Sequence, residues 1–245
     1  MSFEAMLAFK NIKGAILKKM WVELKRKYKY GGSKHFAIHL LYQILNKLFY
    51  FECLHVMRLS MKDINSKYLS LHNGFSGKFL SSEEIEKYFL GNDSEFELPP
   101  NVLENRDECF AILENLEIAS YGWYSKKPTA VTGEFKISIP QNFRYMHHGY
   151  TSEKYRGKRL HAIGMSKALQ ILSMNKDCDG LVSVVSAENA SSLVSTERLG
   201  FVPIGKIFII AKLNRYFVFH TKNCQSAGVS LRKNRPNIFA HFFRS

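Results

Sequence analysis

Residues 150–161 read Tyr150-Thr-Ser-Glu-Lys-Tyr-Arg-Gly-Lys-Arg-Leu-His161, and this basic stretch joins a predicted strand to a predicted helix. The strand covers Phe143–Thr151, and the helix covers Arg159–Leu172, where apolar residues recur at helical spacing. The first amides of a helix have no acceptor within it, and the helix dipole makes that end electropositive. The junction therefore predicts a site for a diphosphate, with a solvated basic turn as the alternative. Four cations lie there: Lys154, Arg156, Lys158 and Arg159.

A second informative stretch, Glu188–Phe201, reads E-N-A-S-S-L-V-S-T-E-R-L-G-F. It follows Gly180–Ser186, an almost continuous apolar run that predicts a buried strand. Asn189 is expected to cap a short helix over Ala190–Leu199, and Gly200 is expected to end it. Taken alone, this stretch is also consistent with a cap and a stop signal that have no other role.

The remaining pattern predicts further strands separated by turns, at Glu52–Leu59, Cys109–Glu114, Glu117–Tyr124, Phe201–Leu213 and Arg215–Thr221. Ser81 to Glu84 resembles a helix N-terminus, and Thr129–Pro140 shows no clear pattern, so it is predicted as a connection. A helix between two strands indicates a right-handed crossover. The fold class predicted is mixed α/β (α+β), built round one sheet.

Together, at this spacing, the two stretches resemble the GCN5-related N-acetyltransferase (GNAT) superfamily. There, a Y-R-G-x-G-type stretch follows the fourth strand and an N-x-x-[AS] stretch ending in [LA]-G-F follows the fifth. The resemblance covers roughly Cys109 to Tyr216, and more loosely the strand at 52–59. It implies a GNAT-like, mostly antiparallel sheet flanked by helices. The matching residues are Tyr155, Arg156, Gly157, Lys158, Asn189, Ser192, Leu199, Gly200 and Phe201.

The resemblance implies that acetyl-CoA, or another acyl-CoA, is the donor substrate. In the superfamily the fourth and fifth strands splay apart, and the pantetheine arm lies between them. This assigns the backbone near Gly149, Tyr150 and Thr151 to the pantetheine and thioester. It assigns Asn189 and Ser192 to the pantetheine as well. The turn assigned to the pyrophosphate comprises Arg156, Gly157, Lys158, Arg159, Leu160 and His161.

Three residues depart from the superfamily pattern. The motif reads R-x-x-G-x-[GA], and Arg159 and His161 stand where the two small residues belong. Neither permits the close backbone approach of glycine, and Arg159 either contacts the phosphate itself or points into solvent. Thr196 stands where many members have a tyrosine that protonates the leaving thiolate, and threonine is a much poorer proton donor.

The reaction also needs a base, because an amine of ordinary pKa is mostly protonated at pH 7. Several members carry an acidic residue on the fourth strand, where this chain has Tyr145, which is no base at neutral pH. His147 shares a predicted strand face with Tyr145 and is a candidate base. His148 faces the other way unless Gly149 introduces a bulge. Tyr150 is a candidate acid. The alternative is that both histidines are polar strand residues that contact substrate or neighbours.

The composition is that of a folded protein: the 245 residues are 46% hydrophobic and 23% charged, which excludes disordered and collagen-like classes. The net charge of +14 favours anionic partners such as phosphorylated cofactors, acidic lipids or nucleic acid. Half of this excess lies in residues 1–34, which hold nine basic and two acidic side chains. No aromatic-interleaved binding motif accompanies it, so nucleic acid is not expected as a partner.

The four cysteines are widely separated and have no Cys/His spacing suited to zinc, so reduced thiols and no metal are predicted. The longest apolar stretch, residues 36–57, is interrupted by charged and polar residues, which a bilayer-spanning helix would avoid. No secretory signal is apparent, because lysines interrupt the N-terminal stretch. A cytoplasmic location is expected, with peripheral membrane contact as an option.

Three segments are predicted: a basic helical extension over 1–50, a GNAT-like acyltransferase domain over 51–221, and a basic tail over 222–245. Residues 3–29 alternate apolar and basic positions at helical spacing. This helix either packs on the domain with a solvated lysine face, or contacts a membrane surface or an acidic partner such as acyl carrier protein. A second helix is predicted from Ser33 to about Tyr50. The oligomeric state stays open.

The function predicted is acyl-CoA-dependent N-acetyl transfer from acetyl-CoA to an amine. The acceptor could be an amino sugar, a small amine or a protein amine. A sugar-linked acceptor is the first choice, because a long N-terminal region before a GNAT-like core resembles acetyltransferases of cell-envelope polysaccharide pathways. The alternatives are transfer of a longer acyl chain from CoA or acyl carrier protein, and a CoA-binding module that has lost catalysis.

Overall fold

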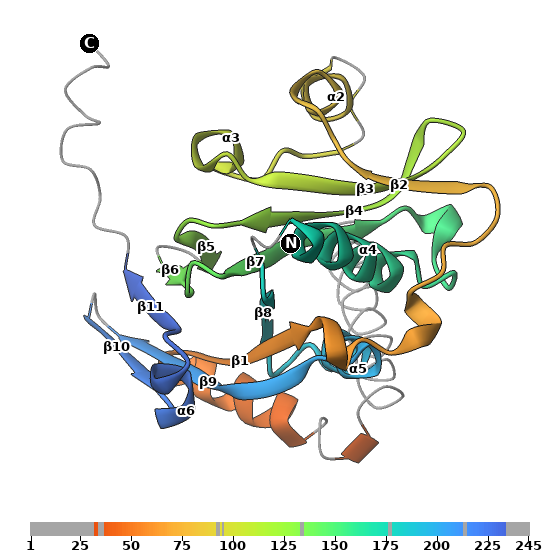
Figure 1. The fold of residues 1–245 in the computed structure, drawn as a ribbon. Helices are drawn as coiled ribbons and strands as arrows, with labels where there is room; N and C mark the ends of the chain where they lie inside the picture. The colour runs from red at the N-terminus through yellow and green to blue at the C-terminus, as the bar shows by residue number, and fades with distance from the viewer. Residues whose placement is uncertain are drawn as a thin grey trace, which may run out of the picture.

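The computed structural model describes residues 32–33, 37–91, 94, 96–132, 135–175, 178–212 and 215–233. Most of these residues belong to an eight-stranded sheet, a smaller three-stranded sheet and the helices that cover them (Figure 1). The basic helix predicted over 3–29 and the far end of the predicted tail lie outside the described residues. In the described part of the chain, no helix is long and apolar enough to cross a membrane.

The large sheet has the strand order β10-β9-β1-β8-β7-β4-β3-β2. Every neighbouring pair is antiparallel except β7 and β8, which are parallel. The predicted mixed, mostly antiparallel sheet is therefore confirmed. Its strands are β1 (Tyr50–Ser60), β2 (Phe75–Phe79), β3 (Glu108–Glu114), β4 (Glu117–Ser125), β7 (Phe143–Thr151), β8 (Gly180–Ser186), β9 (Val202–Lys212) and β10 (Arg215–His220).

The parallel strands β7 and β8 pair only at their start, where Phe143–Tyr145 lies beside Gly180–Val182. Each strand then continues without pairing to the other, β7 to Thr151 and β8 to Ser186. The helix α4 (Leu160–Met174) is the crossover between them, and α5 (Ala190–Leu199) follows β8. The two halves of the sheet consequently diverge from the β7–β8 junction, which is visible in Figure 1.

Helices cover both faces of the large sheet because its strands are apolar on both sides. On one face, Leu160 and Ile163 of α4 pack with Phe110 and Ile112 of β3, and all four are almost fully buried. Each such side chain contributes roughly 1.5–3 kcal/mol by its burial. On the other face of β3 and β4, the core includes residues of α3 (Val102–Asn105) and of η3 (Glu86–Leu90). The helix η3 follows α2 (Ser82–Ile85), which begins with the predicted cap at Ser81.

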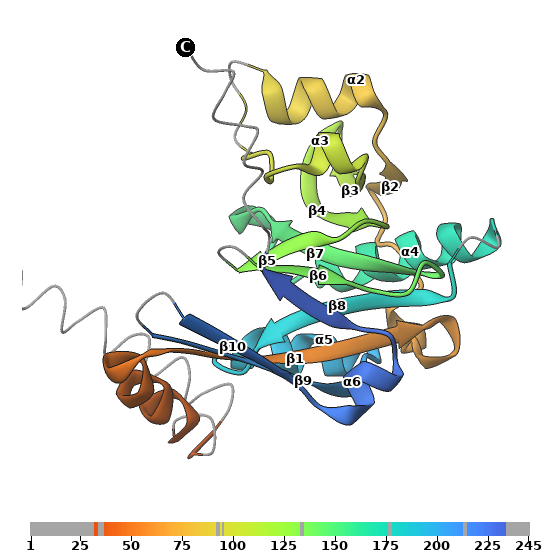
Figure 2. The same ribbon diagram turned by 90° about the vertical axis from the view of Figure 1, so that its left-hand side faces the viewer.

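The segment predicted as an unpatterned connection instead forms the strands β5 (Thr129–Thr132) and β6 (Phe135–Ser138). They are too short to show a convincing alternation, although Phe135 and Ile137 are buried in turn. The first half of the predicted tail also folds, as α6 (Lys222–Ser226) and β11 (Ser230–Lys233). The strand β11 pairs with β6, and the resulting small sheet packs with α6 against β1, β8 and β9 (Figure 2). The three-segment division otherwise stays a prediction.

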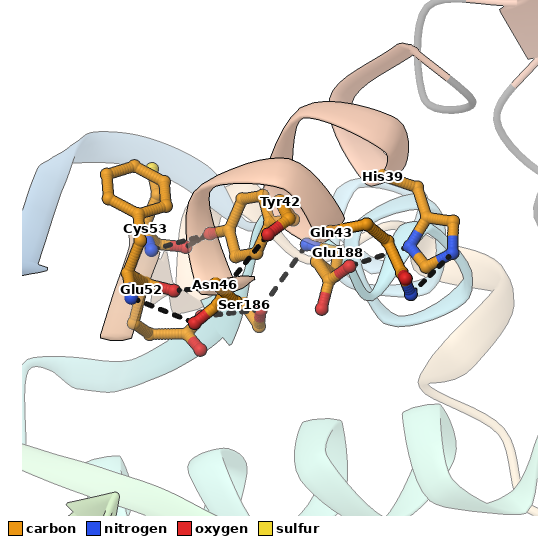
Figure 3. A network of polar contacts seen from close by, with 9 residues as sticks. His39, Tyr42, Gln43, Asn46, Glu52, Cys53, Ser186 and Glu188 are labelled. Atoms are coloured by element: carbon orange, nitrogen blue, oxygen red, sulfur yellow. Dashed lines mark hydrogen bonds and ion pairs between the residues drawn. The ribbon is translucent and has the colours of Figure 1, made fainter. Parts of the chain in front are cut away.

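Residues 37–48 are helical and attach to the large sheet through polar contacts (Figure 3). The Tyr42 hydroxyl accepts a hydrogen bond from the Cys53 amide (2.5 Å) and donates one to the Cys53 carbonyl (3.1 Å). His39 Nδ1 lies 2.7 Å from Glu188 Oε1, which connects this helix to the loop that precedes α5. The predicted second helix therefore docks on β1 and on the end of β8.

Candidate functional site

The divergence of β7 and β8 leaves a cavity of about 340 Å³ between them, here called the gap cavity. Residues 145–149 of β7 and 183–186 of β8 form its two sides. The helix α4 contributes His161 and Met165, and the cap residue Asn189 and the helix α5 contribute the rest: Asn189, Ser192, Ser195 and Thr196. Beyond Tyr145 and Val182 the two strands do not pair with each other, although the Ser183 hydroxyl donates to the Met146 carbonyl at 3.3 Å. The other main-chain groups on these edges are donors and acceptors for an extended ligand.

A β-bulge shapes the β7 side of the gap cavity. Tyr121 of β4 pairs with Tyr150, and Trp123 pairs with His147, so His148 and Gly149 together oppose Gly122. His148 has a φ of 45°, in the left-handed region that costs a non-glycine residue on the order of 1 kcal/mol. The bulge lets His147 and His148 both line the gap cavity, with their Nδ1 atoms 2.7 Å apart.

A second cavity, of about 640 Å³, lies at the N-terminus of α4 and is here called the basic cavity. Four cations line it: Lys67, Arg156, Arg159 and Arg198. Leu160, His161 and Ala162, in the first turn of α4, also line the basic cavity. Their backbone amides have no acceptor within the helix. Cations and free helix amides together suit a polyanion such as a diphosphate.

His161 stands between the two cavities and lines both of them. Its imidazole lies over Gly149: a Cβ atom on that glycine would be 2.0 Å from His161 Cε1. Burial lowers the pKa of His161 to about 4, so the ring is neutral at pH 7. Ser195 is the other residue that both cavities share.

Most of the residues predicted to bind the donor gather at these two cavities. The basic cavity holds Thr151, Arg156, Gly157, Arg159, Leu160 and His161. The gap cavity holds Gly149, His161, Asn189 and Ser192, together with the candidate bases His147 and His148. Asn189 also caps α5, because its Oδ1 accepts hydrogen bonds from the Ser192 amide and the Ser191 hydroxyl.

Two predicted site residues lie outside both cavities. The Lys158 ammonium lies over the rings of Phe75 and Tyr155, at 5.1 and 5.3 Å from their centroids. The Tyr150 ring packs against those of Phe96 and Tyr121, with centroids 5.7 and 5.6 Å away. The structure therefore does not bring the Lys158 charge or the Tyr150 hydroxyl to the cavities.

Thr196 lines the gap cavity, but its hydroxyl is committed to the backbone of its own helix. It donates to the carbonyls of Ser192 and Leu193, at 3.0 and 2.9 Å. This bonding agrees with its expected weakness as a proton donor, because the hydroxyl already has acceptors that are close and fixed.

Two cations of the basic cavity, Lys67 and Arg198, are not among the site residues predicted from the sequence. Arg198 comes from α5, within the stretch that supplied Asn189, and its position three residues before Phe201 could have suggested it. Lys67 comes from the short helix η2 (Ser66–Tyr68), in a polar stretch whose sequence carries no motif. Among the residues described, no group of three His, Cys, Asp or Glu side chains is placed to hold a metal ion.

Comparison with solved structures finds partial matches of low sequence identity, three of which are described here. The GCN5-related N-acetyltransferase from Kribbella flavida is 11% identical, with a TM-score of 0.42, covering 62% of this chain and 54% of its own. The GCN5-related N-acetyltransferase-like protein from Streptococcus suis 89/1591 is 14% identical, with a TM-score of 0.45 and coverages of 69% and 65%.

A third structure, the GCN5-related N-acetyltransferase from Sphaerobacter thermophilus, is 12% identical, with a TM-score of 0.45. The match covers 85% of this chain and 59% of that one. This chain thus spans between about half and two thirds of the length of these three structures. No family model and no curated protein matches the sequence.

Proposed function

We propose that the chain is an acyl-CoA-dependent N-acyltransferase that transfers an acetyl group from acetyl-CoA to an amine. One observation carries the proposal: the basic cavity adjoins the gap cavity, and His161 lies between them. A ligand with phosphates at one end and a long amide-containing arm at the other matches this arrangement. CoA thioesters have that composition.

The residues present fit such a donor. Arg156, Arg159, Arg198 and Lys67 would hold its phosphates together with the first amides of α4. The unpaired edges of β7 and β8 would bind the amides of its arm. The His161 ring lies between the two cavities and would face the donor where its phosphates meet its arm. Acetyl-CoA would supply an acetyl group activated as a thioester.

The chain's own contribution to the reaction is to bind, orient and deprotonate. His148 is the proposed base, because it lines the gap cavity where the acceptor amine would meet the acetyl group. Burial lowers the pKa of His148, so the ring is neutral and able to accept a proton at pH 7. The acceptor is proposed to be an amino sugar at a membrane surface, and the basic residues 1–34 support that choice by their charge.

The test is calorimetric titration of acetyl-CoA and CoA into the wild type and Arg156→Glu. Charge reversal in the basic cavity should weaken binding about fivefold to thirtyfold, equivalent to ~1–2 kcal/mol. Lys87→Glu, on the exposed surface of η3, makes the same charge change away from both cavities and should bind like the wild type. Absence of heat with either ligand, or equal weakening in both variants, would overturn the donor assignment.

Two further outcomes separate the alternatives. Binding without turnover across a panel of amines would favour a CoA-binding module that has lost catalysis. Mass spectrometry of the acylated product would distinguish acetyl transfer from transfer of a longer chain, for which acyl carrier protein is the second donor to test.

A further inference from the structure

Asp107 is a buried carboxylate outside both cavities, in the turn between α3 and β3. Its side chain is 1% exposed. Neither carboxylate oxygen has a hydrogen-bond partner among the described residues. A buried charge in this state is costly unless another group compensates it. The environment of Asp107 therefore requires an explanation.

The group that faces Asp107 is His147. His147 Nε2 lies 3.2 Å from Asp107 Oδ2, and the histidine side chain is 4% exposed. The contact falls short of hydrogen-bond geometry but is within ion-pair distance. The His147 ring is also stacked on Tyr145, with centroids 5.5 Å apart and planes 7° apart. His147 is thus held between a buried carboxylate and an aromatic ring.

On its other side, His147 contacts His148. The two Nδ1 atoms are 2.7 Å apart, and a hydrogen bond at this distance needs one proton between them. Asp107 favours the proton of a neutral His147 on Nε2, which leaves Nδ1 as an acceptor. His148 must then donate from Nδ1, and its Nε2 keeps a free lone pair. For a neutral His147, the protonation pattern follows from the order carboxylate, histidine, histidine.

We propose that Asp107 is a positioning residue that acts through His147 to present His148 Nε2 as the proton acceptor of the gap cavity. The catalytic meaning of this arrangement rests on the proposed function, whereas the protonation pattern itself does not. When His148 takes a proton from an amine, it becomes a cation. Asp107 compensates that charge through His147, in the way that a buried carboxylate orients and supports a basic histidine.

The other ionisable groups around the pair leave Asp107 as its main charged neighbour. Burial raises the pKa of Tyr145, so the tyrosine is neutral, and burial keeps His161 neutral as well. Arg144, also on β7, has its Nε 3.9 Å from Glu108. The strand β8 and the helix α5 present no charged side chain to the gap cavity. Burial lowers the pKa of His148, and the negative charge of Asp107 acts in the opposite direction.

The test is nitrogen-15 NMR of the histidine rings against pH, in the wild type, Asp107→Asn and the control Glu104→Gln. Glu104 is exposed and lies three residues before Asp107, so Glu104→Gln makes the same chemical change without touching His147. The wild type should show His147 protonated on Nε2 and His148 on Nδ1. Asp107→Asn should lower the pKa of His148 by about 0.5–1 unit, and Glu104→Gln should not change it.

The wild-type spectrum tests the protonation pattern even if Asp107→Asn does not fold. Opposite tautomers or a doubly protonated His147 in the wild type, or an unchanged His148 pKa in a folded Asp107→Asn, would overturn the inference. The measurement needs no ligand, so it can succeed while acetyl-CoA binding fails, and the two proposals are judged separately. If the enzyme is active, Asp107→Asn should lower kcat and shift the acid limb of the pH profile of kcat/KM to lower pH, with the Kd for acetyl-CoA unchanged.

Discussion

Replacing Gly149 by alanine tests the close packing between the bulge of β7 and the first turn of α4. A Cβ atom at this position would lie 2.0 Å from Cε1 and 2.6 Å from Nε2 of His161, and 2.9 Å from Cε of Met146. Gly149 is not in the left-handed region, so its backbone conformation suits alanine. The expected cost therefore comes from the collision with these two side chains alone.

Overpacking of this kind costs ~1–3 kcal/mol. For a chain of this size, each kcal/mol lowers the melting temperature by about 2–4 °C, so Gly149→Ala should melt roughly 2–12 °C below the wild type. His161→Ala removes the ring that the new methyl group meets. In that background Gly149→Ala should cost less than about 0.5 kcal/mol, because only the flexible end of Met146 remains in its way.

The assay is urea unfolding of the wild type, both single variants and the double variant, followed by circular dichroism. Gly164→Ala is the matched control, because its Cβ would meet the nearest atom, Ile112 Cδ1, at an ordinary 3.5 Å. Alanine is also the better helix former, so the control should be neutral or stabilising. A Gly149→Ala variant as stable as the wild type would refute the packing. So would a penalty that persists in full without His161.

Two further predictions concern stability. Tyr42→Phe removes the hydroxyl that accepts a hydrogen bond from the Cys53 amide in Figure 3, and urea unfolding should show a loss of ~1–3 kcal/mol in the free energy of unfolding. The control Tyr50→Phe removes a hydroxyl from a residue that is 41% exposed, and it should cost much less. Burial lowers the pKa of His161 to about 4 in the folded protein. In the unfolded chain the same ring binds a proton below about pH 6.5, so the free energy of unfolding should fall as the pH is lowered from 6.5 to 4. His161→Ala should flatten that decline, and a decline of the same slope would contradict the assignment.

The sequence predicts the elements around the site well because their signals are local. The strand β7, the strand β8 and the helix α5 have the residue limits expected from an aromatic-rich run, an apolar run and a cap with a glycine stop. The short strands β5, β6 and β11 have no comparable signal. They depend on pairing with one another and on packing against the large sheet.

The residues of the candidate site also fall into two groups: those that a local sequence signal predicts, and those that only the tertiary fold brings to the site. Arg156 and Arg159 could be placed at a helix N-terminus because the strand, turn and helix follow one another along the chain. Asp107 and Lys67 could not, because only the tertiary fold brings them next to His147 and to α4. The bulge at His148 is predictable only in part. Gly149 in the sequence allows a bulge there, but it is the pairing of β7 with β4 that places one at this position.

The place of β1 between β8 and β9 has a consequence for how the protein is made. Glu52 of β1 and Ser186 of β8, which form a hydrogen bond, are separated by 134 positions in the chain. At a synthesis rate of ~5–20 residues per second, β1 leaves the ribosome on the order of ten seconds before either strand that will flank it. During that interval the apolar side chains of β1 have neither of their neighbouring strands, β8 and β9, to pack beside. The strand therefore stays unpaired on both edges until the last third of the chain has been synthesised.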